Sequence, residues 1–249
     1  MAFVDVGGAR LEVERIDVGR AAAPPIVMLH EGLGSVAMWK DFPHRVAHAA
    51  NRDVVVYSRA GYGRSAPATL PYGVRYMHDE ALVALPRLLD ACGIVRPILL
   101  GHSDGGSIAL IHAAAAGRPV AGLALMAPHV IVEDVSIASI AAAKVAWRTT
   151  DLRARLSRYH DDVDRAFIGW NDIWLHPDFR AWNIEALVRD VRCPVLAIQG
   201  EDDEYGTMDQ IERIARLAPD VELVRLADCR HSPHRDQPEA VLEALVRFV

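Results

Sequence analysis

The chain has 249 residues, of which 51% are apolar and 24% charged, and a formal net charge of −6. This composition is typical of a globular domain and excludes disordered, collagen-like and coiled-coil chains. The acidic balance argues against a nucleic-acid-binding protein, which needs concentrated lysine and arginine.

The sequence also argues against a membrane protein and a secreted one. No apolar run reaches the roughly 18 residues of a membrane span, and the first 20 residues lack the apolar core of a signal peptide. Cys92, Cys193 and Cys229 have no paired spacing, which disfavours a disulfide framework or a zinc site. We therefore expect a cytoplasmic monomer or homodimer that acts on a small molecule without a metal or cofactor.

Short apolar runs alternate with helical stretches along the chain. Arg10–Asp17 alternates apolar and polar residues, which predicts an early antiparallel edge strand. Buried strands are expected at Pro25–Leu29, Asp53–Tyr57, Pro97–Leu100, Val120–Met126, Pro194–Gln199 and Val221–Leu226. Helices are expected at Trp39–Ala50, Tyr76–Ala91, Gly105–Ala116, Met208–Leu217 and Pro238–Val249. This order predicts an α/β fold with a mostly parallel sheet of about eight strands, flanked by helices.

Residues 129–192 interrupt this alternation because they contain no convincing strand. The interval holds Trp147, Trp170, Trp174 and Trp182. We predict a helical cap, inserted after the sixth strand, over the sheet edge where open α/β sheets bind ligands. Residues 1–128 and 193–249 would then form the core. The alternative is an ordinary helical layer with the tryptophans as core residues.

The stretch Gly101-His102-Ser103-Asp104-Gly105 follows an apolar strand and precedes a helical pattern. The spacing G-x-S-x-G in this context predicts a nucleophile elbow, a sharp strand-to-helix turn that exposes the Ser103 hydroxyl. Glycines remove the side chains that would collide in such a turn. The alternative is a glycine-rich turn with Ser103 as a helix N-cap.

A serine hydroxyl needs a base to become a good nucleophile. His231 lies in the loop after the last predicted strand, at the same sheet edge as Ser103, and is our candidate base. His234 shares this loop and is the second candidate. His102 precedes Ser103, and we expect its side chain to point away from the cleft.

An acid is expected after the strand Pro194–Gln199, where it would orient the histidine and stabilise its charged form. Four carboxylates, Glu201 to Glu204, follow this strand. Asp203 is the preferred acid and Asp202 the second choice. An acid after the preceding strand, at Glu133 or Asp134, is a further alternative.

Two backbone N–H groups should form an oxyanion hole. The Asp104 amide and Gly32, in the loop after Pro25–Leu29, are the expected donors. Glu31 is unfavourable there unless it turns outward to a cation or is protonated and active. Together with Glu31, the residues His129, Trp170 and Trp174 are weak candidates for substrate binding, and a structural role for His129 is equally open.

Taken together, these motifs resemble the α/β-hydrolase family over nearly the whole chain. His30–Ser35 followed by Trp39 is similar to its oxyanion loop, and Ser58–Ser65 to its D-x-x-G-x-G-x-S loop. The elbow, the acid turn and the histidine loop match as well. Departures from the usual residues are Glu31 for glycine, Leu33 for proline, Ser58 for aspartate, and Asp104 for methionine, leucine or glutamine.

The resemblance implies a serine hydrolase with the triad Ser103, Asp203 and His231. Relatives of this size include carboxylesterases, lactonases, thioesterases and hydrolases of carbon–carbon bonds in ring-cleavage products. Dehalogenases and epoxide hydrolases carry aspartate as nucleophile, so Ser103 argues against both. We expect hydrolysis of a small carboxylic ester or related acyl substrate. The alternatives are carbon–carbon bond hydrolysis of a vinylogous diketone and a non-catalytic receptor for a small molecule.

Overall fold

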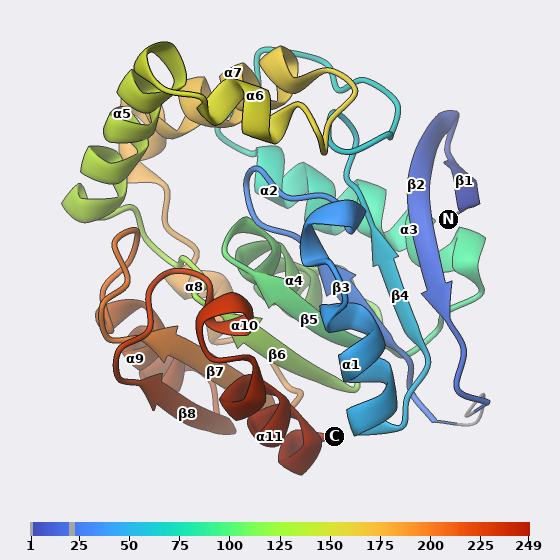
Figure 1. Cartoon of the computed structure of the whole chain (residues 1–249). Helices are drawn as coiled ribbons and strands as arrows, with labels where there is room; N and C mark the ends of the chain where they lie inside the picture. The colour runs from blue at the N-terminus through green and yellow to red at the C-terminus, as the bar shows by residue number, and fades with distance from the viewer. Residues whose placement is uncertain (1, 20–22) are drawn as a thin grey trace.

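The computed structural model describes residues 2–19 and 23–249, which contain one eight-stranded sheet (Figure 1). The strands are β1 (Ala2–Val6), β2 (Ala9–Ile16), β3 (Ile26–Leu29), β4 (Val54–Tyr57), β5 (Ile98–His102), β6 (Gly122–Met126), β7 (Val195–Gly200) and β8 (Val221–Leu226). Their order in the sheet is β1-β2-β4-β3-β5-β6-β7-β8. The predicted mostly parallel α/β sheet is therefore confirmed.

The sheet is antiparallel only at its N-terminal end. β2 pairs antiparallel with β1 and with β4, whereas all pairs from β4 to β8 are parallel. The prediction that Arg10–Asp17 forms an edge strand is wrong, because β1 folds back onto β2 and is itself the edge. A turn through Gly7 and Gly8, both with positive φ, makes this hairpin possible.

Helices cover both faces of the sheet. They are α1 (Phe42–Ala50), α2 (Tyr76–Asp79), α3 (Leu85–Cys92), α4 (Asp104–Ala115), α5 (Asp134–Thr149), α6 (Leu152–Leu156), α7 (Val163–Trp174), α8 (Glu185–Val188), α9 (Asp209–Leu217), α10 (Pro233–Asp236) and α11 (Pro238–Phe248). Short 3-10 helices at Val36–Trp39 and Pro177–Ala181, and a π-helix at Glu80–Ala84, complete them.

Successive strand residues point to opposite faces, so each buried strand contributes to two cores. Ile26 and Met28 of β3 pack with α1 and α11, whereas Val27 and Leu29 pack with α3 and α4 on the other face. This burial on both faces explains why the parallel strands are continuous apolar runs.

The chain between β6 and β7 is helical. It contains α5 to α8, and its one strand-like contact in the described structure is an isolated bridge between Ile131 and Asn183. Figure 1 shows α5, α6 and α7 gathered at the end of the sheet toward which β4 and β5 point. The helical insertion after the sixth strand is therefore present, while its treatment as a separate cap at residues 129–192 stays a prediction.

The loops that follow β3, β5, β7 and β8 leave the sheet at one edge because all four strands are parallel. The chain builds outward from β3 in both directions, so β3 and β5 flank the point where the strand order reverses. Ligands of open α/β sheets bind at such a point. Among the described residues, no helix has the length and apolar character needed to cross a membrane.

Candidate active site

Ser103 occupies a strained turn between β5 and α4. Its φ of 54° and ψ of −120° lie in a region that non-glycine residues rarely adopt. A Cβ on Gly105 would lie 2.1 Å from the carbonyl oxygen of Leu29, and one on Gly101 would lie 2.3 Å from the carbonyl oxygen of Gly105. Gly105 therefore lets the turn pack against the end of β3, and Gly101 lets the start of α4 lie against β5.

The loop after β8 carries His231 to this turn. Nε2 of His231 lies 3.0 Å from Oγ of Ser103, although 128 residues separate the two in the chain. This distance is within hydrogen-bond reach, as proton transfer from the hydroxyl requires.

Asp203, in the loop after β7, holds the other side of the imidazole. Both of its carboxylate oxygens lie 2.9 Å from Nδ1 of His231. Its Oδ1 also accepts hydrogen bonds from the backbone N–H groups of Tyr205 and Gly206, and Oδ2 accepts one from Gln199.

The carboxylate of Asp203 is ionised. Burial by itself would raise the pKa of Asp203, but the hydrogen bonds from His231 and from the Tyr205 backbone outweigh it and lower the pKa. An ionised acceptor at Nδ1 keeps the imidazole proton on that nitrogen. Nε2 is then unprotonated and faces the Ser103 hydroxyl.

The alternative residues for these positions lie elsewhere. His234 packs against Trp39, at 4.7 Å between ring centroids, and burial holds its pKa well below the ordinary value. Asp202 is exposed. Glu133 accepts hydrogen bonds from Thr207, and Asp134 forms an ion pair with Arg180.

His102 belongs to the lining of the cavity at Ser103. Its side chain is buried and packs against Trp39 and His234 instead of facing the Ser103 hydroxyl, in line with the expected direction away from the cleft. Its Nε2 lies 2.7 Å from the backbone oxygen of His231, and Nδ1 lies 3.5 Å from Glu31. The side chain therefore supports the loop of His231 rather than the hydroxyl of Ser103.

The two expected oxyanion donors are available. Within the described chain, the N–H groups of Gly32 and Asp104 make no backbone hydrogen bond. Both belong to turns that meet beside Ser103, one after β3 and one at the start of α4. Trp170 of α7 covers the first turn so closely that a Cβ on Gly32 would lie 2.2 Å from its indole nitrogen.

Glu31 turns toward Arg235 and His102. Its carboxylate lies 3.4 Å from Arg235 and 3.5 Å from His102. Burial would raise the pKa of Glu31, but these neighbours lower it well below the ordinary value. Of the two roles considered for Glu31, the structure favours the outward ion pair over a protonated acid.

The pKa of Asp104 shifts in the opposite direction to that of Glu31. Burial raises the pKa of this carboxyl group, although the nearby Arg59 and the hydrogen bond from Tyr76 partly counteract the effect. The Tyr76 hydroxyl donates to Oδ2 of Asp104 at 2.7 Å, and Nη2 of Arg59 lies 3.9 Å away. These contacts hold the side chain of Asp104 against Tyr76 and Arg59.

A small cavity of about 130 Å³ opens over Ser103. Its lining includes every residue that the sequence singled out for substrate contact, namely Glu31, His129, Trp170 and Trp174. Burial and the neighbouring His231 lower the pKa of His129 to about 3, so this imidazole is neutral. Its ring lies 5.0 Å from that of Trp174.

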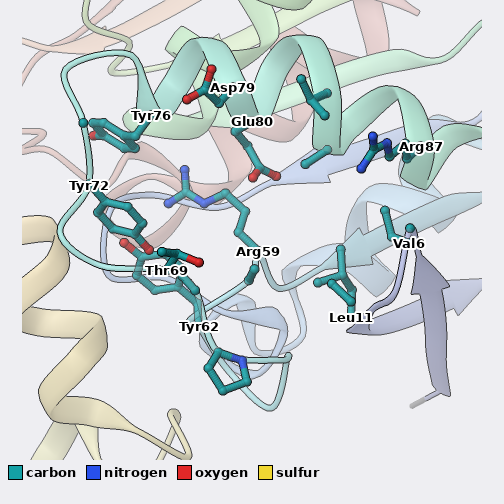
Figure 2. A pocket seen from close by; sticks show the side chains of 18 of the residues that line it. Val6, Leu11, Arg59, Tyr62, Thr69, Tyr72, Tyr76, Asp79, Glu80 and Arg87 are labelled. Atoms are coloured by element: carbon teal, nitrogen blue, oxygen red, sulfur yellow. The ribbon is translucent and has the colours of Figure 1, made fainter.

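A larger cavity of about 680 Å³ lies beside the first one and shares no lining residue with it. Arg59, Tyr62, Tyr72 and Tyr76 form its inner end (Figure 2). Tyr76 lines the larger cavity and Asp104 the smaller, so their hydrogen bond separates the two. Because Ser103 and His231 line only the small cavity, any chemistry at the serine belongs there.

Sequence reasoning missed Arg59, Tyr76 and His160, which hold the loops around Ser103. His160 accepts a hydrogen bond from the Gly63 N–H at Nδ1 and donates one from Nε2 to the Leu33 carbonyl. The sequence offers one weak signal for Arg59, its position directly after Ser58 in the glycine-containing loop. His160 carries none, because its partners are about 100 residues or more away.

The described residues contain no group of three or more histidine, cysteine or carboxylate side chains that could hold a metal ion. The three cysteines are free thiols.

A comparison with protein families agrees with this geometry. Residues 26–244 match the family described as the alpha/beta hydrolase family. The chain belongs to this family. It is therefore an α/β-fold hydrolase, and its predicted family resemblance is confirmed.

Two individual relatives are each less than 30% identical to this chain. The chain is 28% identical to a protein of Pseudomonas savastanoi pv. phaseolicola that is named as a proposed carbamate hydrolase, RutD, and the match covers 92% of this chain and 95% of that one. This chain is also 29% identical to polyketide synthase ThaQ of Burkholderia thailandensis. The match covers 98% of this chain but only 12% of ThaQ, which is much longer.

Among solved structures, the enol-lactonase of Burkholderia xenovorans LB400 superposes with a TM-score of 0.79 at 20% identity, covering 99% of each chain. At this identity the likeness shows the shared fold.

Proposed function

We propose that this hydrolase cleaves a small carboxylic ester, or a related acyl substrate such as a lactone or thioester, through an acyl-enzyme on Ser103. The observation that carries the proposal is the continuous hydrogen-bonded chain from Ser103 through His231 to Asp203. The backbone N–H groups of Gly32 and Asp104, which have no backbone partner in the described part of the chain, support the same reaction.

In this reaction Oγ of Ser103 attacks the substrate carbonyl carbon while Nε2 of His231 takes the hydroxyl proton. Asp203 stabilises the imidazolium that forms, because its ionised carboxylate already faces Nδ1. The N–H groups of Gly32 and Asp104 bind the oxyanion. His231 then returns the proton to the leaving group, and water releases the acid by the same steps.

The size of the cavity limits the acyl group. A volume of about 130 Å³ is below the roughly 300–1,000 Å³ of sites for drug-sized ligands. Its walls combine apolar side chains, such as Ile140 and Trp170, with polar ones, such as Glu31 and the neutral His129. These features favour a short or compact acyl group, and we assign substrate contacts to His129, Trp170 and Trp174.

The direct test is hydrolysis of p-nitrophenyl esters of increasing acyl length, with labelling by a fluorophosphonate. We expect the protein to turn over acetate and butyrate esters and to be labelled, and Ser103→Ala to abolish both. Ser157→Ala, at an exposed position between β6 and β7, is the matched control and should behave as the wild type. Equal activity in Ser103→Ala would refute the assignment.

The same screen should include a lactone, a thioester, a carbamate and a vinylogous diketone. The carbamate is included because one relative is named as a proposed hydrolase of that class. Preference for the diketone by orders of magnitude would instead favour carbon–carbon bond hydrolysis. Binding without turnover or labelling would favour a receptor.

A further inference from the structure

Arg59 is a buried cation beside the loop after β3, and sequence reasoning assigned it no role. It follows β4 in the loop that starts at Ser58, and only 3% of its surface is exposed. Figure 2 shows its side chain between Tyr72 and Glu80 at the inner end of the large cavity. An arginine remains charged at any ordinary pH, so its burial requires strong partners.

Its contacts reach the oxyanion loop after β3. Nη2 of Arg59 donates a hydrogen bond to the carbonyl oxygen of Glu31 at 2.8 Å, and its backbone N–H donates to Nε2 of His30 at 3.0 Å. Nδ1 of His30 donates to the same carbonyl at 2.7 Å, as does the backbone N–H of Gly34 at 3.1 Å. Three donors therefore fix the carbonyl of Glu31.

This carbonyl determines the direction of the Gly32 N–H. In a trans peptide the C=O of one residue and the N–H of the next lie in one plane and point in opposite directions. Because Arg59 holds the Glu31 oxygen on one side, the Gly32 N–H must point to the other. Gly32 has no side chain to limit rotation of its backbone, so this direction depends on the three donors, of which Arg59 is the one that comes from outside the loop.

Arg59 also lies near the side chain of Asp104, the residue that provides the second donor. Nη2 lies 3.9 Å from Oδ2 of Asp104, the residue whose backbone N–H starts α4. The guanidinium therefore lies between the two turns that provide the oxyanion donors, and one of its nitrogens is near both.

We propose that Arg59 is a positioning residue that holds the peptide of Glu31 and Gly32, and through Asp104 the start of α4, in the orientation that binds the oxyanion. The inference rests on the proposed acyl hydrolysis. It predicts that loss of Arg59 weakens binding of the transition state more than binding of the substrate.

The experiment compares Arg59→Ala and Arg59→Lys with the wild type and with Arg64→Ala, an exposed arginine of the same loop. Each variant is assayed for kcat and KM on a p-nitrophenyl ester and for inhibition by a trifluoromethyl ketone, which forms an oxyanion on serine. Loss of a whole oxyanion donor costs about 100- to 1,000-fold in kcat, so we expect a loss of roughly 10- to 100-fold when the donors are misaligned.

Ketone affinity should fall by the same factor as kcat/KM, while KM changes little and Arg64→Ala matches the wild type. Because Arg59 borders the large cavity, added guanidinium ion can enter beside the truncated side chain of Arg59→Ala. We expect it to restore part of kcat, which a purely structural role would not predict.

Two results would overturn the inference. One is unchanged ketone affinity in both Arg59 variants, and the other is an equal loss of ketone affinity and substrate affinity. If Arg59→Ala does not fold, the ketone affinity of Arg59→Lys decides. A wild type that neither hydrolyses esters nor reacts with the fluorophosphonate would refute the proposed function instead, so the two failures are distinct.

Discussion

Replacement of Asp203 by asparagine tests the polarity of the proposed proton path. Oδ1 faces the backbone N–H groups of Tyr205 and Gly206, so the amide nitrogen of the new side chain cannot occupy that position without opposing two donors. It must take the position of Oδ2, where Gln199 now donates. Gln199 cannot turn its amide to accept without losing the hydrogen bond that the same nitrogen donates to the Gly206 carbonyl, so the new amide nitrogen faces a donor there as well.

In that arrangement an amide N–H faces Nδ1 of His231, which favours the imidazole tautomer with its proton on Nε2. Such an imidazole cannot take the proton of Ser103, and a neutral amide does not stabilise the imidazolium. We expect kcat for a p-nitrophenyl ester to fall by about 10³- to 10⁴-fold, or about 4 to 5.5 kcal/mol, with little change in KM.

Asp202→Asn is the matched control, since Asp202 occupies the same turn and is exposed. It should retain nearly wild-type activity, and both variants should keep the wild-type melting temperature to within a few degrees. If Asp203→Asn retains more than about a tenth of the wild-type kcat, the activation free energy has risen by less than about 1.4 kcal/mol, and the reasoning is refuted. So would an equal loss in Asp202→Asn.

Three further outcomes follow from the geometry. Gly105→Ala should lower both activity and melting temperature, because the added Cβ would lie 2.1 Å from the backbone oxygen of Leu29. Gly73→Ala is the control: its added Cβ would have no atom within 4 Å, so activity and melting temperature should stay at the wild-type values. Burial lowers the pKa of His160, so its contribution to stability is complete above about pH 6.5 and declines as the pH falls below that value. In thermal melts at decreasing pH, the melting temperature of the wild type should therefore begin to fall at a higher pH than that of His160→Gln. Parallel curves for the two proteins would contradict this. Ile140→Ala should enlarge the small cavity and raise kcat/KM for longer acyl esters relative to acetate, and an unchanged chain-length profile would remove Ile140 from the acyl pocket.

Local patterns were sufficient for most of the fold. A buried parallel strand is apolar throughout because both of its faces are covered, so β3 to β7 are visible as short apolar runs. The elbow at Ser103 is equally local, because its steric requirement is met by glycines two positions away on each side. The hairpin partner β1 was missed because it is an exposed edge strand with a weaker pattern.

The residues of the candidate site could be predicted where the order of strands and loops leaves few candidates. They could not be predicted where contacts between distant loops decide which residues meet. Local motifs and chain order were enough to propose Ser103, a histidine after the last strand, and Asp203 ahead of Asp202. Folding was needed to show that Asp203 contacts His231 while Asp202 is exposed, that Glu31 pairs with Arg235, and that Arg59 contacts the oxyanion loop. The physical reason is that periodicity and turn chemistry depend on neighbouring residues, whereas ion pairs and hydrogen bonds between loops depend on distances that exist only after the strands have aligned.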